Sequence, residues 1–257
     1  MIFHSKASFS LVLLLSAFVQ SCATTGIKTL SPTQRAKLIV QVANGALLEG
    51  DPTGALQHLA KAEESDPNLP ELHHTKALAY HAKHDDIRAI AEARLAVSIQ
   101  PAYSEANNTL GKLLLDQGRY DEAEKPLMVA ATNPLYRDSY RAYTNLGILY
   151  YRKEDDKKSE DALSKAIQES PTLSCIAYYY MGHIHLKNGS VLTALGDYEK
   201  ASQKFCAGFA DAHLAVGVLY EKNKDYEHAR KKFLDIKQSF PNTKIAEQAM
   251  EHLKYIP

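Results

Sequence analysis

The sequence predicts an all-α solenoid of about six helix-turn-helix units followed by a capping helix. A small residue, Gly or Ala, recurs every 34 to 36 residues between Ala43 and Gly217, and a second small residue follows it twelve positions later. A proline stands near the end of several units, where it would stop a helix. A fixed period of this length indicates stacked helical hairpins, in which each unit contacts only its neighbours.

The small residues are expected where the two helices of a unit cross closely. The first of each unit is Ala43, Ala77, Gly111, Gly147, Gly182 or Gly217, and the second is Ala55, Ala89, Ala123, Ser159, Ala194 or Ala229. A larger residue at these positions would force the helix pair apart. Bulky apolar residues sixteen positions after the first, such as Leu127 and Phe233, are expected to fill the core between successive units.

This pattern resembles the tetratricopeptide repeat, a helix-turn-helix unit of 34 residues. The resemblance implies a right-handed superhelix with repeats over about 36–69, 70–103, 104–137, 140–173, 175–208 and 210–243, within a repeat region of 34–243. Residues 244–257 contain Ile245, Ala249 and Leu253 at a spacing of four, which predicts an amphipathic helix. Such a helix would cap the open face of the last repeat.

The N-terminal segment has the layout of a secretory signal. Lys6 precedes an apolar run from Phe9 to Val19, and the run ends at Ser21-Cys22. This arrangement resembles the lipobox of bacterial lipoproteins, which implies a signal peptide over 1–21, acyl chains on Cys22 and a leash over 22–33. Ala23 stands where inner-membrane lipoproteins often carry Asp, so the resemblance implies an outer-membrane protein that faces the periplasm. An ordinary signal peptide with an incidental cysteine is the alternative.

The composition and motifs predict a protein without catalytic activity. Thirty basic and thirty acidic residues cancel, so no bulk charge favours nucleic acid as a partner. The sequence has no glycine-rich phosphate loop, G-x-S-x-G, H-E-x-x-H or paired CxxC. His74, His81 and His84 lie close together without an acidic ligand that could complete a metal site. We therefore expect no enzyme activity, no cofactor and no metal.

Two cysteines beyond Cys22 are candidates for a disulfide. Cys175 is expected to open the first helix of the fifth repeat, and Cys206 follows its second helix. Antiparallel helices bring those two ends together, and an oxidising compartment would favour the bond. Two unlinked thiols remain the alternative, because helix ends can lie beyond the reach of about 7 Å between Cα atoms.

The concave surface is the expected partner-binding site. In this repeat class the first helix of each unit lines that surface through its positions 2, 5, 9 and 12. The residues expected there include Asn108, Lys112, Leu115, Arg141, Thr144, Ile148, Tyr151, Tyr179, His183 and Leu186. Tyrosine and arginine are common in binding hot spots, so we expect a monomer that binds another protein. A generic solvated face is the alternative.

The link between the third and fourth repeats is more distinctive than the repeat pattern. It reads Asn133-Pro134-Leu135-Tyr136 and continues to Ser139, and Asn145-Leu146-Gly147 follows. This segment resembles pilotin-like outer-membrane lipoproteins of type IV pilus biogenesis, which have six tetratricopeptide repeats. The resemblance implies a helper for localisation and multimerisation of the secretin, the outer-membrane ring through which the pilus exits.

Pro134, Leu135 and Tyr136 then form an alternative partner surface. Two other functions stay open at this point. The chain could be a periplasmic adaptor that docks cell-wall hydrolases, or a receptor for a different secretion ring.

Overall fold

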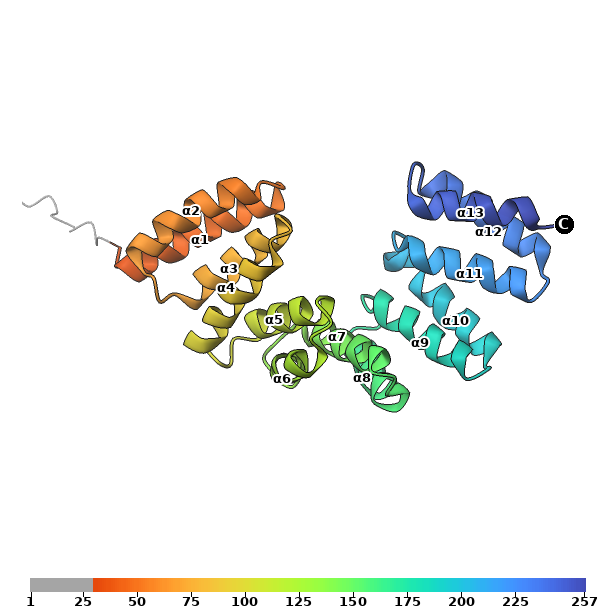
Figure 1. The fold of residues 1–257 in the computed structure, drawn as a ribbon, viewed down its shortest axis with the longest axis horizontal. Coiled ribbons are helices and arrows are strands. Elements are labelled where there is room, and N and C mark those ends of the chain that lie inside the picture. The colour runs from red at the N-terminus through yellow and green to blue at the C-terminus, as the bar shows by residue number, and fades with distance from the viewer. Residues whose placement is uncertain (1–29) are drawn as a thin grey trace, which may run out of the picture.

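The computed structural model describes residues 30–257, which form a curved stack of helical hairpins (Figure 1). Within these residues there are thirteen α-helices, one short 3₁₀-helix and no strand. The predicted signal peptide and Cys22 lie outside the described residues. The helices are α1 (Pro32–Leu48), α2 (Pro52–Ser65), α3 (Pro70–Ala82), α4 (Asp86–Ile99), α5 (Ser104–Asp116), α6 (Tyr120–Ala131), α7 (Ser139–Arg152), α8 (Asp156–Glu169), α9 (Cys175–Lys187), α10 (Val191–Ala201), η1 (Lys204–Cys206), α11 (Ala210–Lys222), α12 (Tyr226–Ser239) and α13 (Lys244–Tyr255).

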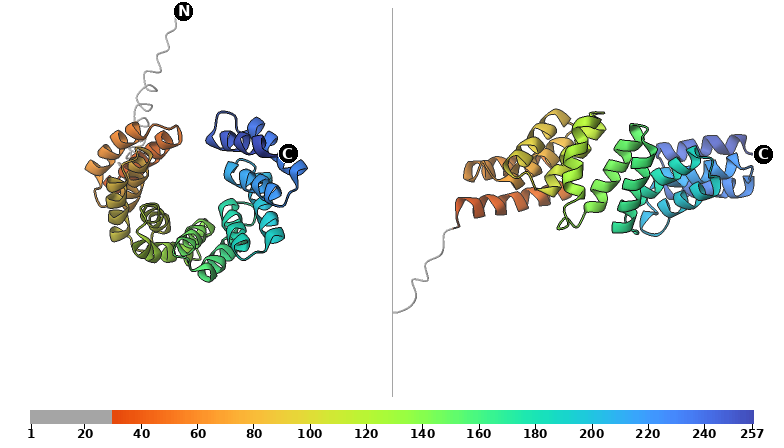
Figure 2. Two further views of the ribbon diagram at one scale, coloured as in Figure 1. Left: turned by 45° about the vertical axis from the view of Figure 1, so that its right-hand side comes forward. Right: turned by 90° about the horizontal axis from the view of Figure 1, so that it is seen from below.

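The helices pair as α1 with α2, α3 with α4, and so on to α11 with α12, which gives six hairpins. Each hairpin packs on the next, and the odd-numbered helices from α1 to α9 also pack on one another in succession. Among the described helices, successive even-numbered helices make no comparable contact, so the stack curves toward the odd-numbered helices and forms an open arc (Figure 2). The odd-numbered helices form the inner layer.

Close helix crossings explain the repeated small residues. A Cβ atom added to Gly147 would lie 2.4 Å from Cδ2 of Leu163, and one added to Gly217 would lie 2.6 Å from Cε1 of Phe233. Ser159 replaces the usual alanine at the second small position, and its buried hydroxyl donates to the carbonyl oxygen of Gly147 at 2.8 Å. The prediction of an all-α tetratricopeptide-type solenoid is therefore confirmed.

The turn inside each hairpin needs one residue with a left-handed backbone. Glycine fills this position in alternate hairpins, at Gly50, Gly118 and Gly189, where φ lies between 72° and 79°. His84 and Glu154 occupy the same position in two other hairpins, with φ of 58° and 60°. Glycine adopts this conformation without steric cost, whereas other residues do so rarely.

The first helix begins earlier than the predicted leash allows. Ser31 and Gln34 form a capping box: the Ser31 hydroxyl accepts from the Gln34 backbone N–H, and the Gln34 side chain accepts from the Ser31 backbone N–H. Pro32 occupies the first helical position, where its missing N–H has no helical partner in any case. These local features start α1 at Pro32, before the expected end of the leash at Thr33.

The C-terminal helix α13 covers the last hairpin. Ala249 is fully buried against α12, and the His252 ring stacks on Phe233 with 5.1 Å between ring centroids. His252 Nδ1 also lies 2.6 Å from a carboxylate oxygen of Glu221 on α11. The helix therefore buries apolar surface that the terminal repeat would otherwise expose. Within residues 30–257, none of the helices combines the length and hydropathy needed to cross a membrane.

Candidate protein-binding surface

A pocket lies along the inner layer, where the third, fourth and fifth hairpins meet. Its volume is about 500 Å³. Four parts of the chain form its wall: α5, the first half of α7, the start of α9 with the loop before it, and the 205–209 segment. The residues that line it are Asn108, Lys112, Tyr140, Arg141, Thr144, Asn145, Leu173, Ser174, Cys175, Ile176, Phe205, Cys206, Gly208 and Phe209. We call this the inner pocket.

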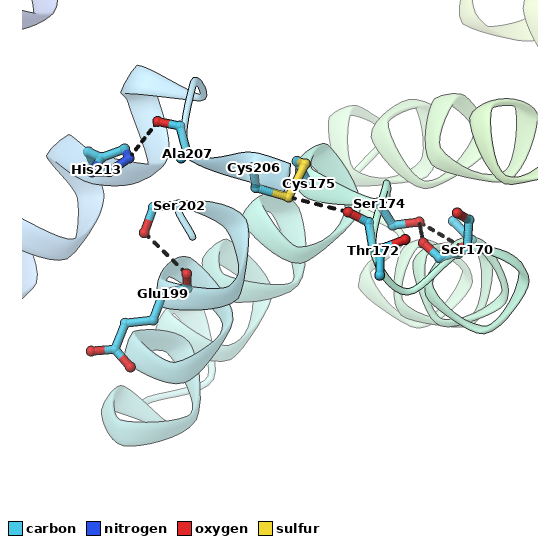
Figure 3. Close-up of a disulfide and its surroundings, with 10 residues drawn as sticks. Ser170, Thr172, Ser174, Cys175, Glu199, Ser202, Cys206, Ala207 and His213 are labelled. Atoms are coloured by element: carbon cyan, nitrogen blue, oxygen red, sulfur yellow. Dashed lines mark hydrogen bonds between the residues drawn. A yellow bond between two sulfur atoms is a disulfide. The ribbon is translucent and has the colours of Figure 1, made fainter. Parts of the chain in front are cut away.

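A disulfide between Cys175 and Cys206 lies in the wall of the inner pocket (Figure 3). The Cα atoms are 5.4 Å apart, and Cys206 is buried. The bond joins the start of α9 to the short helix η1, which lies outside the regular helix pair. It thereby ties the loop that carries Phe205 to the body of the fifth hairpin.

The polar side of the inner pocket is cationic. Arg141 Nε donates to the Tyr140 hydroxyl at 3.0 Å, and its guanidinium lies 5.5 Å from the Tyr140 ring centroid. Lys112 forms an ion pair with Asp116 one helical turn away, at 2.5 Å. No carboxylate lines the pocket among residues 30–257. The pocket therefore presents the guanidinium of Arg141 beside its apolar side, whereas the charge of Lys112 is balanced by Asp116.

Farther along the inner layer lies a second group of aromatic side chains, the tyrosine cluster, which consists of the half-buried Tyr151, Tyr179, Tyr180 and His183 and the buried Tyr198. Tyr179 and His183 have ring centroids 4.4 Å apart, and Tyr151 and Tyr180 are 5.2 Å apart. The Tyr198 hydroxyl and Nδ1 of His183 are hydrogen-bonded at 3.0 Å. Burial raises the pKa of Tyr179 to about 12 and lowers the pKa of His183, which favours the uncharged form of both side chains.

The predicted binding residues divide between these two surfaces. Asn108, Lys112 and Arg141 line the inner pocket, and an amide hydrogen bond of 2.9 Å runs from Asn145 to Asn108 across it. Tyr151, Tyr179 and His183 belong to the tyrosine cluster. A second pocket, of about 310 Å³, separates Tyr179, His183 and Leu186 from α11. Ile148 lies half-buried against the core of the third and fourth hairpins.

Two of the predicted binding residues are not available as expected. Leu115 is 2% exposed, because α3, α4, α6 and α7 all pack around α5. Its assignment to the binding surface is wrong, and it is a core residue. Thr144 lines the inner pocket but is 7% exposed, and its hydroxyl donates to the Tyr140 carbonyl oxygen at 2.7 Å. It offers no free donor to a partner.

Only part of the Pro134–Tyr136 link is exposed to solvent. Leu135 is 88% exposed, whereas Tyr136 packs against the core of the third and fourth hairpins. Asn133 fixes the bend, since its amide donates to the Ser104 hydroxyl at 2.7 Å and its side-chain oxygen accepts from the Leu135 N–H at 3.0 Å. Burial raises the pKa of Tyr136 to about 12. Leu135 and Pro134 remain exposed at the tip of the link.

Sequence reasoning missed the apolar side of the inner pocket. Leu173 and Ile176 are 52% and 45% exposed, Phe205 is 76% exposed, and Phe209 lies half-buried with its ring 5.1 Å from that of Tyr179. These residues belong to the links between hairpins and to the first turn of α9, outside the positions that the repeat pattern assigns to the concave face. Apolar residues in links between amphipathic helices were the available signal.

The three histidines considered as metal ligands have other partners. The His74 ring lies between the Tyr103 hydroxyl at 3.2 Å and the Thr109 hydroxyl at 2.9 Å, and its burial lowers its pKa to about 4. His81 Nδ1 is 2.8 Å from a carboxylate oxygen of Asp86, and His84 occupies a turn. Over residues 30–257, no group of three His, Cys, Asp or Glu side chains is placed to hold a metal ion.

Comparison with known proteins places this architecture among characterised solenoids. The type IV pilus assembly protein PilF of Pseudomonas aeruginosa is 26% identical over 164 residues, which are 62% of this chain and 65% of PilF. The match therefore spans less than two thirds of that relative. A solved structure of Pseudomonas aeruginosa PilF superposes with a TM-score of 0.73 at 21% identity, covering 86% of this chain and 99% of the other. A crystal structure of PilW, described as a widely conserved type IV pilus biogenesis factor, gives a TM-score of 0.74 at 20% identity over 84% and 99% of the two chains.

The sequence profile of the tetratricopeptide repeat matches residues 108–174 and 179–242, together a little over half of the chain. These ranges include the tyrosine cluster and all the residues that line the inner pocket except Cys175 and Ile176. The six hairpins, their close crossings at small residues and this match lead to one conclusion: the chain belongs to the tetratricopeptide repeat family.

Proposed function

We propose that this protein is a non-catalytic, lipid-anchored scaffold of type IV pilus biogenesis that assists localisation and multimerisation of the secretin at the outer membrane. The observation that carries the proposal is the likeness to PilF and PilW. It extends over more than four fifths of the chain in structure and includes 26% sequence identity to PilF over 164 residues.

The physical basis is a raised effective concentration. Acyl chains on Cys22 would confine the solenoid to one membrane surface, and a secretin subunit held there would meet other subunits more often. The inner pocket and the partly exposed rings of the tyrosine cluster supply a cationic and aromatic surface of the composition that protein partners favour. The scaffold then acts stoichiometrically, without a chemical step.

A clean deletion strain tests the proposal. We expect it to lose heat-stable secretin multimers and surface pili while secretin monomer persists, and the wild-type gene should restore both. Two variants then locate the contact: Tyr151→Ala with Tyr179→Ala, and Arg141→Gln, whose exposed side chain leaves the core intact. Circular dichroism melting curves verify that both variants are folded. Normal multimer levels in the deletion strain would remove the secretin role.

A periplasmic adaptor for cell-wall hydrolases is the alternative. An adaptor could use the same lipid anchor and the same repeats. A crosslinking pull-down from membranes distinguishes the adaptor from the secretin scaffold. Secretin among the crosslinked proteins favours the scaffold, and a cell-wall hydrolase without secretin favours the adaptor.

A further inference from the structure

The inner pocket combines two features that a solvated face of a repeat lacks. Leu173, Ile176 and Phe205 expose apolar surface at its edge, each by 45% or more, and a volume of about 500 Å³ lies between them and α7. Pockets of roughly 300 to 1,000 Å³ with apolar walls and a few polar groups are typical of binding sites. Exposed apolar surface gathered around such a hollow indicates that another molecule covers it.

The charge of the pocket restricts what that molecule is. Arg141 and Lys112 line it, and no carboxylate does so among the described residues. However, Asp116 already pairs with Lys112 at 2.5 Å, so Arg141 is the cation that this pocket offers to a partner. Asp138 is 4.0 Å from Arg141 Nε and lies outside the pocket, and the two exposed side chains are held only weakly together. An acidic group from a partner could take the free guanidinium donors in the paired geometry that arginine favours.

The apolar edge depends on an unusual element. Phe205 lies on the three-residue helix η1, where Lys204 adopts a left-handed φ of 53°. Backbone hydrogen bonds within this segment run from the Cys206 N–H to the Gln203 carbonyl oxygen at 2.8 Å, from Ala207 to Lys204 at 3.2 Å and from Phe209 to Cys206 at 2.9 Å. The disulfide and a bond of 2.9 Å from His213 Nε2 to the Ala207 carbonyl oxygen tie the segment to the neighbouring helices (Figure 3). The bond to Cys175 covalently joins the residue after Phe205 to the residue before Ile176, and both apolar residues line the pocket.

We infer that the inner pocket binds a protein segment in which a bulky apolar side chain is flanked by Asp or Glu, and that the Cys175–Cys206 disulfide holds the pocket in its binding shape. The apolar side chain packs between Ile176, Phe205 and Phe209, and the carboxylate pairs with Arg141. This inference rests on the proposed function, because it takes the ligand to be a protein. It adds which side chains of that protein the pocket recognises, namely one bulky apolar residue and a neighbouring carboxylate.

Fluorescence polarisation with the full chain tests the inference. The probe is a labelled ten-residue peptide with one Phe flanked by Asp and Glu. Two comparison peptides replace the Phe with Ala or the acidic residues with Lys. We expect saturable binding of the first peptide and affinities about tenfold lower or worse for the other two, since tenfold corresponds to about 1.4 kcal/mol.

Matched variants assign the binding to the pocket. Arg141→Gln and Phe205→Ala should each weaken the peptide about tenfold. Arg137→Gln, in the exposed link before α7, and Leu192→Ala, 81% exposed on α10, should leave the affinity unchanged. The double variant Cys175→Ala with Cys206→Ala should keep its helical circular dichroism and lose about tenfold in affinity. Equal binding of the acidic and basic peptides, or no effect of Arg141→Gln and Phe205→Ala, overturns the inference.

Other occupants are separated in the same experiment. Displacement of the peptide by a fatty acid with higher affinity, or dimerisation that Phe205→Ala abolishes, would show that a lipid or a second copy fills the pocket and would overturn the inference. The secretin multimer level in the deletion strain is measured independently of peptide binding. Loss of multimers without peptide binding removes only the pocket assignment, and peptide binding with normal multimers removes only the secretin role.

Discussion

His74 shows how burial rather than a ligand role sets the chemistry of a single side chain. Its ring is enclosed between Tyr103 and Thr109, and removal from water lowers its pKa from 6.5 to about 4. Because the folded pKa lies below the unfolded one, the stabilisation is fully present above about pH 6.5 and is lost as the pH falls toward 4. Nearby His73 has the opposite shift, since Glu92 raises its pKa, so its stabilisation is present at low pH and is lost as the pH rises through the folded value.

We therefore predict that His74→Gln removes one acid-sensitive contribution to folding. At 1.36 kcal/mol per unit of pKa, that contribution is about 3 kcal/mol between pH 7 and pH 4. Urea unfolding of the wild type and the variant across this range measures the difference, and comparison of the two chains cancels the effect of His73. Imidazole NMR should show His74 titrating near pH 4. A titration near 6.5 would contradict the prediction.

At the scale of the helix pair, glycine has opposite effects at two kinds of position. Gly147 lies at a crossing where an added methyl group would overlap Leu163 at 2.4 Å, whereas Gly196 lies within α10 with nothing within 4 Å of an added Cβ. We predict that Gly147→Ala lowers the free energy of unfolding by about 1 to 3 kcal/mol through overpacking. Gly196→Ala should raise it by about 0.5 to 1 kcal/mol through the entropy of the unfolded chain.

Thermal and urea unfolding of both variants measures these changes in the free energy of unfolding. Equal effects of the two substitutions would show that helix propensity, and not the crossing, determines the result.

This contrast also explains why the sequence predicts the hairpins well: the small residues recur because the short distance between the two backbones at the crossing requires them. Leu115 was misassigned because a repeat register gives helix positions, while the burial of a position also depends on how many helices surround it.

At the scale of the whole molecule, the membrane anchor is the element on which the proposed function depends. We predict that Cys22→Ser leaves the protein unprocessed or in the soluble periplasmic fraction, because acyl chains bind by burying CH₂ groups at ~0.8 kcal/mol each. Membrane fractionation with mass spectrometry of the N-terminal peptide measures this. Outer-membrane fractionation of the variant, together with an unacylated wild type, would contradict the anchor.

The order of the hairpins and the cap follows from periodicity, but the shape of the inner pocket does not. Its apolar edge comes from Leu173, Phe205 and Phe209 in links whose conformation depends on how successive hairpins stack. Those links have no period, so their side chains cannot be assigned to a face from spacing alone. The concave residues Asn108, Lys112 and Arg141 could be predicted because they follow the helical repeat.

Site-specific photocrosslinking in cells tests the central claim most directly, namely that secretin subunits bind to the inner layer of this solenoid. A photoreactive amino acid is placed at Arg141 or Tyr151 on the inner layer and, as a control, at Leu192 on α10. The account predicts adducts that contain secretin from the first two positions and none from the third. Secretin adducts from Leu192 alone, or no secretin adduct from any position while pili assemble normally, would contradict it.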